Sequence, residues 1–376
     1  MAREENFIDG RKVILEDAAI KQSRVRAYLE KNKLDGVVIT TREHFAWVTG
    51  GGDNHVTFPT NIGFGAIVIT RDKKYLVAHS MDAKRLMEEQ IDGQGYEVME
   101  INWFEGDIRI KAKDLAGRRV GSDTILPDCK FIYMDLVDMH YPMTELEVAR
   151  TRWLAMLTDD IFSALGRAVY PGMTEKDIES KLWNLHTSHN LEVDGIIVGS
   201  DDRCFNYRHP IATKKPLEKY LMLHSVARKW GLHCNLTRFV HFGKLSTKIE
   251  RVYRCAANVE ARTFQSIKPG IKFSDILENQ KKWYAEFGFE NEWKNHFQGG
   301  PTGYVIADGG RSLTNKVVQI NQPYEWFITV TGTKTGELSL LTDEGFEISS
   351  YLNSSWPGRS VKTNSGEIII PDILVR

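Results

Sequence analysis

The chain contains one short pattern twice, Pro171-Gly172-Met173-Thr174-Glu175-Lys176-Asp177-Ile178 and Pro269-Gly270-Ile271-Lys272-Phe273-Ser274-Asp275-Ile276. An amphipathic helical run precedes each copy, and a second helical run follows it. A Pro-Gly break ends a helix, and the hydroxyl of Thr174 or Ser274 can cap the next helix by accepting a bond from an unpaired amide. Two such units indicate a duplicated domain. Duplicated halves commonly meet in a cleft, where small-molecule sites lie.

The composition limits the classes of partner. The chain has 376 residues, too many for one ordinary core, so we expect two domains. Lys and Arg number 49 against 50 Asp and Glu, which disfavours nucleic acid and anionic membrane surfaces as partners. No apolar stretch reaches the roughly 20 residues of a membrane span, and the charged start lacks the apolar core of a signal peptide. We therefore expect a soluble, cytoplasmic protein with a small-molecule substrate and, at its four cysteines, free thiols.

Two domains follow from the hydropathy pattern. Residues 20–120 alternate helical and strand patterns, which indicates a small α/β domain over residues 1–140. A long glycine-rich loop at 47–60 has three adjacent glycines, but no phosphate-binding motif follows them. The second domain, residues 141–376, begins where Thr144 can cap a long helix. Its expected elements are this helix at 145–167, strands at 191–198, 325–330 and 337–342, a polar loop at 199–216, a hairpin at 220–242, and an irregular tail at 356–376 with one short strand.

The hairpin carries a resemblance to a known family. It runs Leu221-Met222-Leu223-His224-Ser225-Val226-Ala227-Arg228-Lys229-Trp230-Gly231-Leu232-His233-Cys234-Asn235-Leu236-Thr237-Arg238-Phe239-Val240. With Ala227, Gly231, Thr237 and Arg238 kept, it resembles the creatinase and aminopeptidase P family, to which prolidase belongs. The resemblance implies an α+β protein: a small α/β creatinase-type N-terminal domain, then a duplicated pita-bread catalytic domain.

The residues at the family's metal-binding positions are different here. In the metallopeptidase members, carboxylates and a histidine bind two divalent metals; the matching residues are His224, Asn235, Gly300, Thr331 and Gly336, with Ala307 at a further histidine position. The resemblance therefore implies no metal and no cofactor. Independently, two hard dications need several carboxylates, and the cleft segments offer Glu337 and little else. A single zinc or iron ion stays an alternative, with His209, His224, His233 and His296 as its candidate ligands.

What remains is a pair of histidines. His209, in the segment Asn206-Tyr207-Arg208-His209-Pro210, matches the histidine that shuttles a proton in creatinase, which also lacks the metal set. Imidazole titrates near neutral pH, so it can take a proton from water and give one to a leaving nitrogen. We expect His209 to be the catalytic acid and base, His296 its partner, and Glu337 a group that orients His209 or binds a cationic part of the substrate.

Five residues are candidates for substrate binding, namely His55, Phe58, His224, Tyr304 and Lys334. Tyr304 and Lys334 are expected near glycines that leave room where a metal would sit. His55 and Phe58 lie on the glycine-rich loop. The resemblance implies a homodimer in which the small domain of one subunit closes over the active site of the other.

The leading hypothesis is a metal-independent creatinase-like hydrolase that cleaves a C–N bond, of amide or amidine type, in a small polar metabolite. Creatine itself is not expected, because Thr60 and Thr237 stand where creatinase has an arginine and a glutamate. Elimination at the same histidine, a lyase reaction, stays open, because a fold does not fix its chemistry. The alternatives are a catalytically altered pseudo-peptidase that binds a small molecule or peptide, and an Xaa-Pro peptidase with an unusual metal site.

Overall fold

The chain divides into two compact units. The computed structural model describes residues 7–58, 60–306 and 315–376. Unit 1 comprises residues 1–149 with 230–232, and unit 2 comprises residues 150–229 and 233–376. Within the described residues, no helix combines the length and apolar character that crossing a membrane requires.

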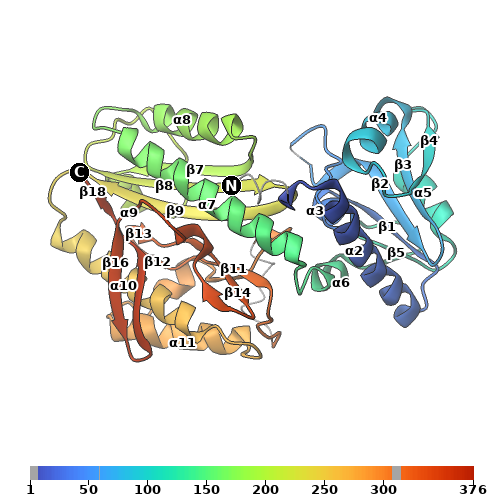
Figure 1. Ribbon diagram of the computed structural model, residues 1–376. Helices are drawn as coiled ribbons and strands as arrows, with labels where there is room; N and C mark the ends of the chain where they lie inside the picture. Colours follow the sequence, from blue (N-terminus) through green and yellow to red (C-terminus); the bar gives the residue numbers. More distant parts are fainter. Residues whose placement is uncertain (1–6, 59, 307–314) are drawn as a thin grey trace. The chain divides into compact units, whose positions relative to one another are not determined.

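Unit 1 is built on a six-stranded mixed sheet with the order β4-β3-β2-β1-β5-β6 (Figure 1). Its strands are β1 (Gly36–Thr41), β2 (Ile62–Thr70), β3 (Lys74–His79), β4 (Glu97–Ile101), β5 (Val120–Ser122) and β6 (Cys129–Phe131). Its helices are α2 (Arg11–Asn32), α3 (Arg42–Val48), α4 (Ser80–Arg85), α5 (Ile108–Ala116) and α6 (Tyr133–Met139), with a π-helical turn at Leu86–Gln90. All six residues of β1 are buried, as expected for a central strand between two layers.

Unit 2 contains the pieces of the duplication. Its helices are α7 (Glu145–Ala168, whose first turn groups with unit 1), α8 (Glu175–Ser188), α9 (Asp202–Asn206), α10 (Thr247–Ser266) and α11 (Phe273–Glu286). One sheet has the order β18-β9-β8-β7, and a second has the order β10-β11-β14-β15. Two hairpins, β12–β13 and β16–β17, complete it. Figure 1 shows α7 and α8 beside the first sheet and α10 and α11 beside the second.

The strands of unit 2 have the following bounds. The first sheet consists of β7 (Glu192–Ser200), β8 (Tyr220–Lys229), β9 (Leu232–His241) and β18 (Leu374–Val375). The second consists of β10 (Gly299–Pro301), β11 (Gln322–Trp326), β14 (Glu337–Thr342) and β15 (Gly345–Glu347). The hairpins are β12 (Thr329–Val330) with β13 (Thr333–Lys334), and β16 (Gly358–Thr363) with β17 (Gly366–Pro371). Short 3-10 helices lie at Glu292–Asn295 and Ser349–Tyr351.

The two copies of the Pro-Gly pattern make the same backbone contacts. The amide of Gly172 donates to the carbonyl of Leu217 at 2.8 Å, and the amide of Gly270 donates to Val318 at 2.9 Å. Both glycines have positive φ, 98° and 84°, a conformation that favours glycine. The residue two positions after each glycine forms an isolated antiparallel bridge, with Pro216 in one copy and Val317 in the other. These matching contacts confirm the predicted duplication.

Thr174 caps α8 as predicted, whereas Ser274 caps no helix. Thr174 and Asp177 form a reciprocal capping box. Helix α11 begins one residue before Ser274, and its N-cap residue Lys272 makes no side-chain cap bond. The reason is the residue at the cap position: Lys272 matches Thr174, and a lysine side chain has no acceptor for the helix amides.

Three predicted loops contain regular structure. The tail is not irregular: β16 and β17 pair along their length, and β18 pairs with β9 in parallel. The polar loop at 199–216 contains α9. The first part of the glycine-rich loop is the end of α3, where Trp47 is fully buried. In each case burial of apolar side chains, such as Ile370 in β17, outweighs local turn composition.

A buried ion triad links the elements of unit 2. The Arg238 guanidinium on β9 pairs with Asp159 of α7 at 2.7 Å and with Glu337 of β14. All three side chains are at most 3 % exposed. Arg238 also donates to the backbone carbonyl of Ser350. One cation thus joins both four-stranded sheets to the first helix of the domain.

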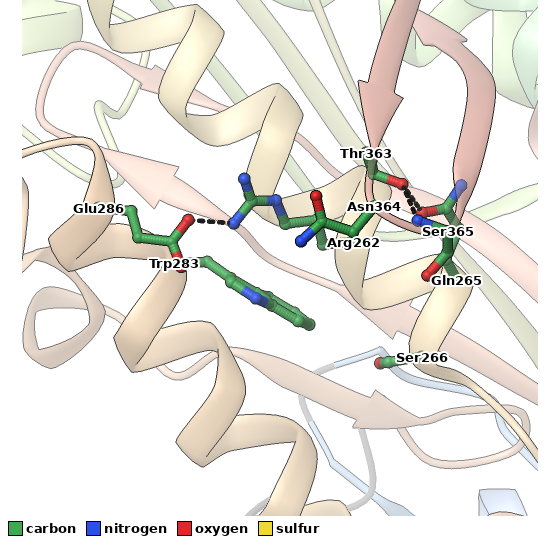
Figure 2. A pocket seen from close by; sticks show the side chains of 8 residues that line it. All are labelled: Arg262, Gln265, Ser266, Trp283, Glu286, Thr363, Asn364 and Ser365. Carbon is green, nitrogen blue, oxygen red and sulfur yellow. Dashed lines mark hydrogen bonds and ion pairs between the residues drawn. The ribbon is translucent and has the colours of Figure 1, made fainter.

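We predict that Arg238→Met destabilises the protein by about 3–5 kcal/mol, because it leaves two carboxylates buried without a cation. The matched control is Arg262→Met. Arg262 pairs with the half-exposed Glu286 at the edge of a cavity of about 240 Å³ (Figure 2), so its loss should cost about 0–1 kcal/mol. Urea unfolding measures both values. Equal losses in the two variants would show that the buried triad does not hold unit 2 together.

Candidate functional site

Two histidines from the two repeats meet in unit 2. His209 follows α9 in the first repeat, and His296 follows the 3-10 helix Glu292–Asn295 in the second. Their Nε2 atoms are 3.1 Å apart, and the rings meet edge to face with centroids 5.1 Å apart. The structure therefore brings together the two histidines that the sequence analysis paired.

The hydrogen bonds assign the tautomers of this pair. His296 Nδ1 faces the backbone carbonyl of Phe297, which can only accept, so Nδ1 carries the proton. In a neutral His296 the Nε2 atom is then the acceptor, and His209 Nε2 must be the donor. The lone pair of neutral His209 is consequently on Nδ1. Among the residues that the structure describes, no side chain or backbone group bonds to that atom.

Lys334 gives the site its charge. Its side chain is buried on β13, and Nζ lies 4.7 Å from the centroid of the Phe327 ring, on which His296 also packs. Burial lowers the pKa of Lys334 to about 8. Burial, together with the Lys334 charge, lowers the pKa of His296 to about 4 and lowers that of His209. At neutral pH both imidazoles are therefore uncharged beside an ammonium group.

His224 and Tyr304 lie in the interior of unit 2. His224 is 5 % exposed, and its Nδ1 is 2.9 Å from Thr237 Oγ1. Burial and the Lys334 charge hold the pKa of His224 well below its usual value. Tyr304 is also buried. At Gly300 a Cβ atom would meet nothing within 4 Å, so there is open space at this position.

Two polar groups of the site were missed from sequence. Glu325 on β11 is buried; it accepts bonds from the amide of Asn235 at 2.7 Å and from Thr302 Oγ1 at 3.0 Å. Glu292 pairs with Arg208 and accepts from Thr331 Oγ1 at 2.7 Å, which anchors the segment that carries His209. An acidic residue inside the apolar run Tyr324-Glu325-Trp326 was the available signal for the first.

Glu337 and His233 are engaged elsewhere. Glu337 pairs with Arg238 and accepts from Ser350 Oγ at 2.6 Å, so it does not orient His209 as the sequence analysis expected. His233 Nε2 lies 2.7 Å from Asp194 Oδ2, and its Nδ1 faces the carbonyl of Gly303. His233 therefore does not join the other histidines around one ion.

His55 and Phe58 belong to unit 1. Their rings lie 5.0 Å apart, His55 Nδ1 is 2.7 Å from Asp53 Oδ1, and Arg42 covers the Phe58 ring. Phe58 is 66 % exposed. Their predicted role at a partner's site stays a prediction.

The residues at the family's metal-binding positions do not suit a pair of divalent metals. Such a pair needs bridging carboxylates, whereas these positions hold His224, Asn235, Gly300, Thr331 and Gly336. His224 Nδ1 is occupied by Thr237, and Asn235 by Glu325. A Cβ at Gly336 would lie 2.8 Å from Thr237 Oγ1, so a longer side chain needs rearrangement there. Ala307 lies outside the described residues.

The lowered pKa of His296 predicts a pH-dependent stability. Its pKa of about 4 in the folded protein lies below the ordinary 6.5 of the unfolded chain, so between these values the unfolded state binds the extra proton. Stability is therefore highest above pH 6.5 and falls toward pH 4. Because His296 is partly exposed, we expect its share between pH 7 and pH 5 to be about 1 kcal/mol. Urea unfolding should show a smaller drop in His296→Gln; an unchanged drop would contradict this assignment.

Comparisons with known protein families find matches to two domain models, which together cover most of the chain. Residues 150–324 match the model of metallopeptidase family M24, and residues 21–126 match that of the creatinase/prolidase N-terminal domain. The Xaa-Pro dipeptidase of Pyrococcus horikoshii is 19% identical over 344 residues, which cover 86% of this chain and 95% of that protein.

Solved structures show the same fold. The Xaa-Pro dipeptidase from Bacillus anthracis has a TM-score of 0.73 at 18% identity, covering 96% of this chain and 100% of its own. The prolidase from Pyrococcus horikoshii OT3 has a TM-score of 0.76 at 18% identity, and the match covers 89% of this chain and 99% of that one. The X-Pro aminopeptidase from Thermotoga maritima MSB8 has a TM-score of 0.73 at 18% identity, and the match covers 94% of this chain and 99% of that one.

These findings correct the leading hypothesis from the sequence. A metal-independent creatinase-like hydrolase of a small metabolite is wrong, because the relatives and structural neighbours with a named activity are Xaa-Pro dipeptidases, prolidases and aminopeptidases. The predicted α+β fold, with a creatinase-type N-terminal domain and a pita-bread domain after it, is confirmed. The chain belongs to the creatinase, aminopeptidase P and prolidase family.

Proposed function

We propose that this protein is a peptidase of the Xaa-Pro class, which hydrolyses the C–N bond of a short peptide at the site in unit 2. The proposal is supported by one observation above others. A fold shared along nearly its whole length with Xaa-Pro peptidases carries, where its two repeats meet, a histidine pair with a basic nitrogen unbonded among the described residues.

In this proposal His209 and His296 act as a unit. His296 Nε2 accepts the Nε2–H bond of His209, which fixes the ring and leaves the His209 Nδ1 lone pair to take a proton from water. The deprotonated water attacks the scissile carbonyl carbon, and the protonated His209 then gives its proton to the nitrogen as the C–N bond breaks. Arg208, held by Glu292 and Thr331, fixes the backbone next to His209.

A second function is favoured by a specific observation. The family's metal-binding positions hold Gly300, Thr331 and Gly336, none of which can offer a carboxylate. In this second function, the site in unit 2 binds a peptide without hydrolysing it. The two functions share the ligand and differ in turnover.

Several expectations from the sequence are part of the proposal. They are a cytoplasmic location, a domain boundary at residues 140/141, and a homodimer in which His55 and Phe58 of one subunit reach the site of the other. Light scattering at several protein concentrations measures the oligomeric state.

We predict that His209→Asn lowers proline release from Xaa-Pro dipeptides by about 100-fold or more, because it removes the proton acceptor. The matched control is His189→Asn, at the exposed end of α8, which should keep wild-type turnover. Mass spectrometry of the products, with and without added manganese or zinc, measures the rate.

The outcomes separate the two functions. Proline release that depends on His209 supports the peptidase. Peptide binding by calorimetry without release, under every metal condition, supports the binding protein. Neither binding nor release would overturn both.

A further inference from the structure

A cavity of about 660 Å³ lies in unit 2, between α9, the first two turns of α10 and the turn that joins β12 to β13. Two aromatic rings, two basic side chains and two neutral polar side chains line most of it: Phe205, Phe289, Lys248, Arg251, Asn206 and Thr247. Neither His209 nor His296 is among the described residues of this lining. The cavity is therefore distinct from the site of the histidine pair.

The two basic side chains share one face of α10. Lys248 and Arg251 lie three positions apart on the helix, which makes their side chains neighbours. Lys248 Nζ lies 4.0 Å from the centroid of the Phe205 ring, and the guanidinium carbon of Arg251 lies 5.0 Å from that of Phe289. Attraction between a cation and a ring face holds each charge at the edge of the cavity.

The carboxylates near this face pair with other cations. Glu250 on α10 pairs with Arg359, and Glu292 pairs with Arg208. In the part of the chain that the structure describes, neither Lys248 nor Arg251 makes an ion pair. Two like charges side by side on a helix repel each other, and an anion bound between them removes that cost.

The donors at the cavity suit a phosphate group. A guanidinium can donate two parallel N–H bonds to two phosphate oxygens, and an ammonium group adds a compact charge and further donors. The Thr247 hydroxyl and the Asn206 amide supply neutral donors in the same lining. The volume lies within the range of about 300–1,000 Å³ that is typical of small-molecule sites, so an organic group attached to the phosphate also has room.

We propose that this cavity binds the phosphate group of a small phosphorylated molecule, with Lys248 and Arg251 as the residues that hold it. The proposal does not depend on the proposed peptidase activity. The cavity does border the segment that carries His209: Thr331, which also lines it, accepts a bond from Arg208 at 2.9 Å. A bound phosphate ester would therefore lie beside the residues that anchor His209.

The test is isothermal titration calorimetry on the full chain at low ionic strength, with inorganic phosphate and adenosine monophosphate as probes, because salt screens exposed charges. The wild-type protein should bind phosphate with a Kd of about 1 mM or below, and the ester at least as tightly. The double variant Lys248→Gln/Arg251→Gln should bind both probes at least 10-fold more weakly. The matched control is Arg254→Gln/Lys282→Gln, which removes two exposed charges of α10 and α11 outside the lining and should keep wild-type affinity.

Three results would overturn the proposal. The first is the absence of phosphate binding by the wild-type protein up to about 10 mM, a comparison that needs no variant. The second is equal affinity in the wild-type protein and in Lys248→Gln/Arg251→Gln. The third is binding of inorganic phosphate with exclusion of the ester, which would make the cavity a site for the free ion rather than for a phosphorylated molecule.

Discussion

The ion triad of Arg238, Asp159 and Glu337 sets the charge distribution of unit 2. It joins β9, β14 and α7, and it engages a carboxylate that lies only three residues beyond Lys334 in the sequence. Glu337 is paired with Arg238, and Glu325 is the one carboxylate whose charge acts on Lys334 among the described residues. The triad thus connects the elements on either side of the site.

Burial and the Lys334 charge together keep the histidines neutral. A nearby ammonium group and partial burial both disfavour imidazolium, so His209 and His296 are neutral where an isolated histidine would be partly charged. A neutral pair linked through Nε2 atoms has one donor and one acceptor and leaves one basic nitrogen. The site therefore offers a proton acceptor close to a cation, which suits hydrolysis of a peptide bond.

Much of the fold was predictable because it rests on local signals. The Pro-Gly turns and the Thr174 cap depend on backbone conformation and short-range hydrogen bonds, and β14 has the predicted bounds. The histidine pair came from a resemblance rather than from spacing. The contact of Glu337 was not predicted, because its partner, Arg238, is distant in sequence. Burial of a charged side chain also cannot be inferred from its charge alone. The tail hairpin was missed because its strands gain stability from packing against the rest of unit 2.

The central claim is that the site in unit 2 binds a short peptide beside a neutral histidine pair. A crystal structure of the protein with a slowly hydrolysed Xaa-Pro analogue tests this most directly. The account predicts that the scissile bond lies beside His209, with His209 Nδ1 about 3 Å from the attacking water. A peptide bound with its scissile bond away from His209, or outside unit 2, would contradict the account.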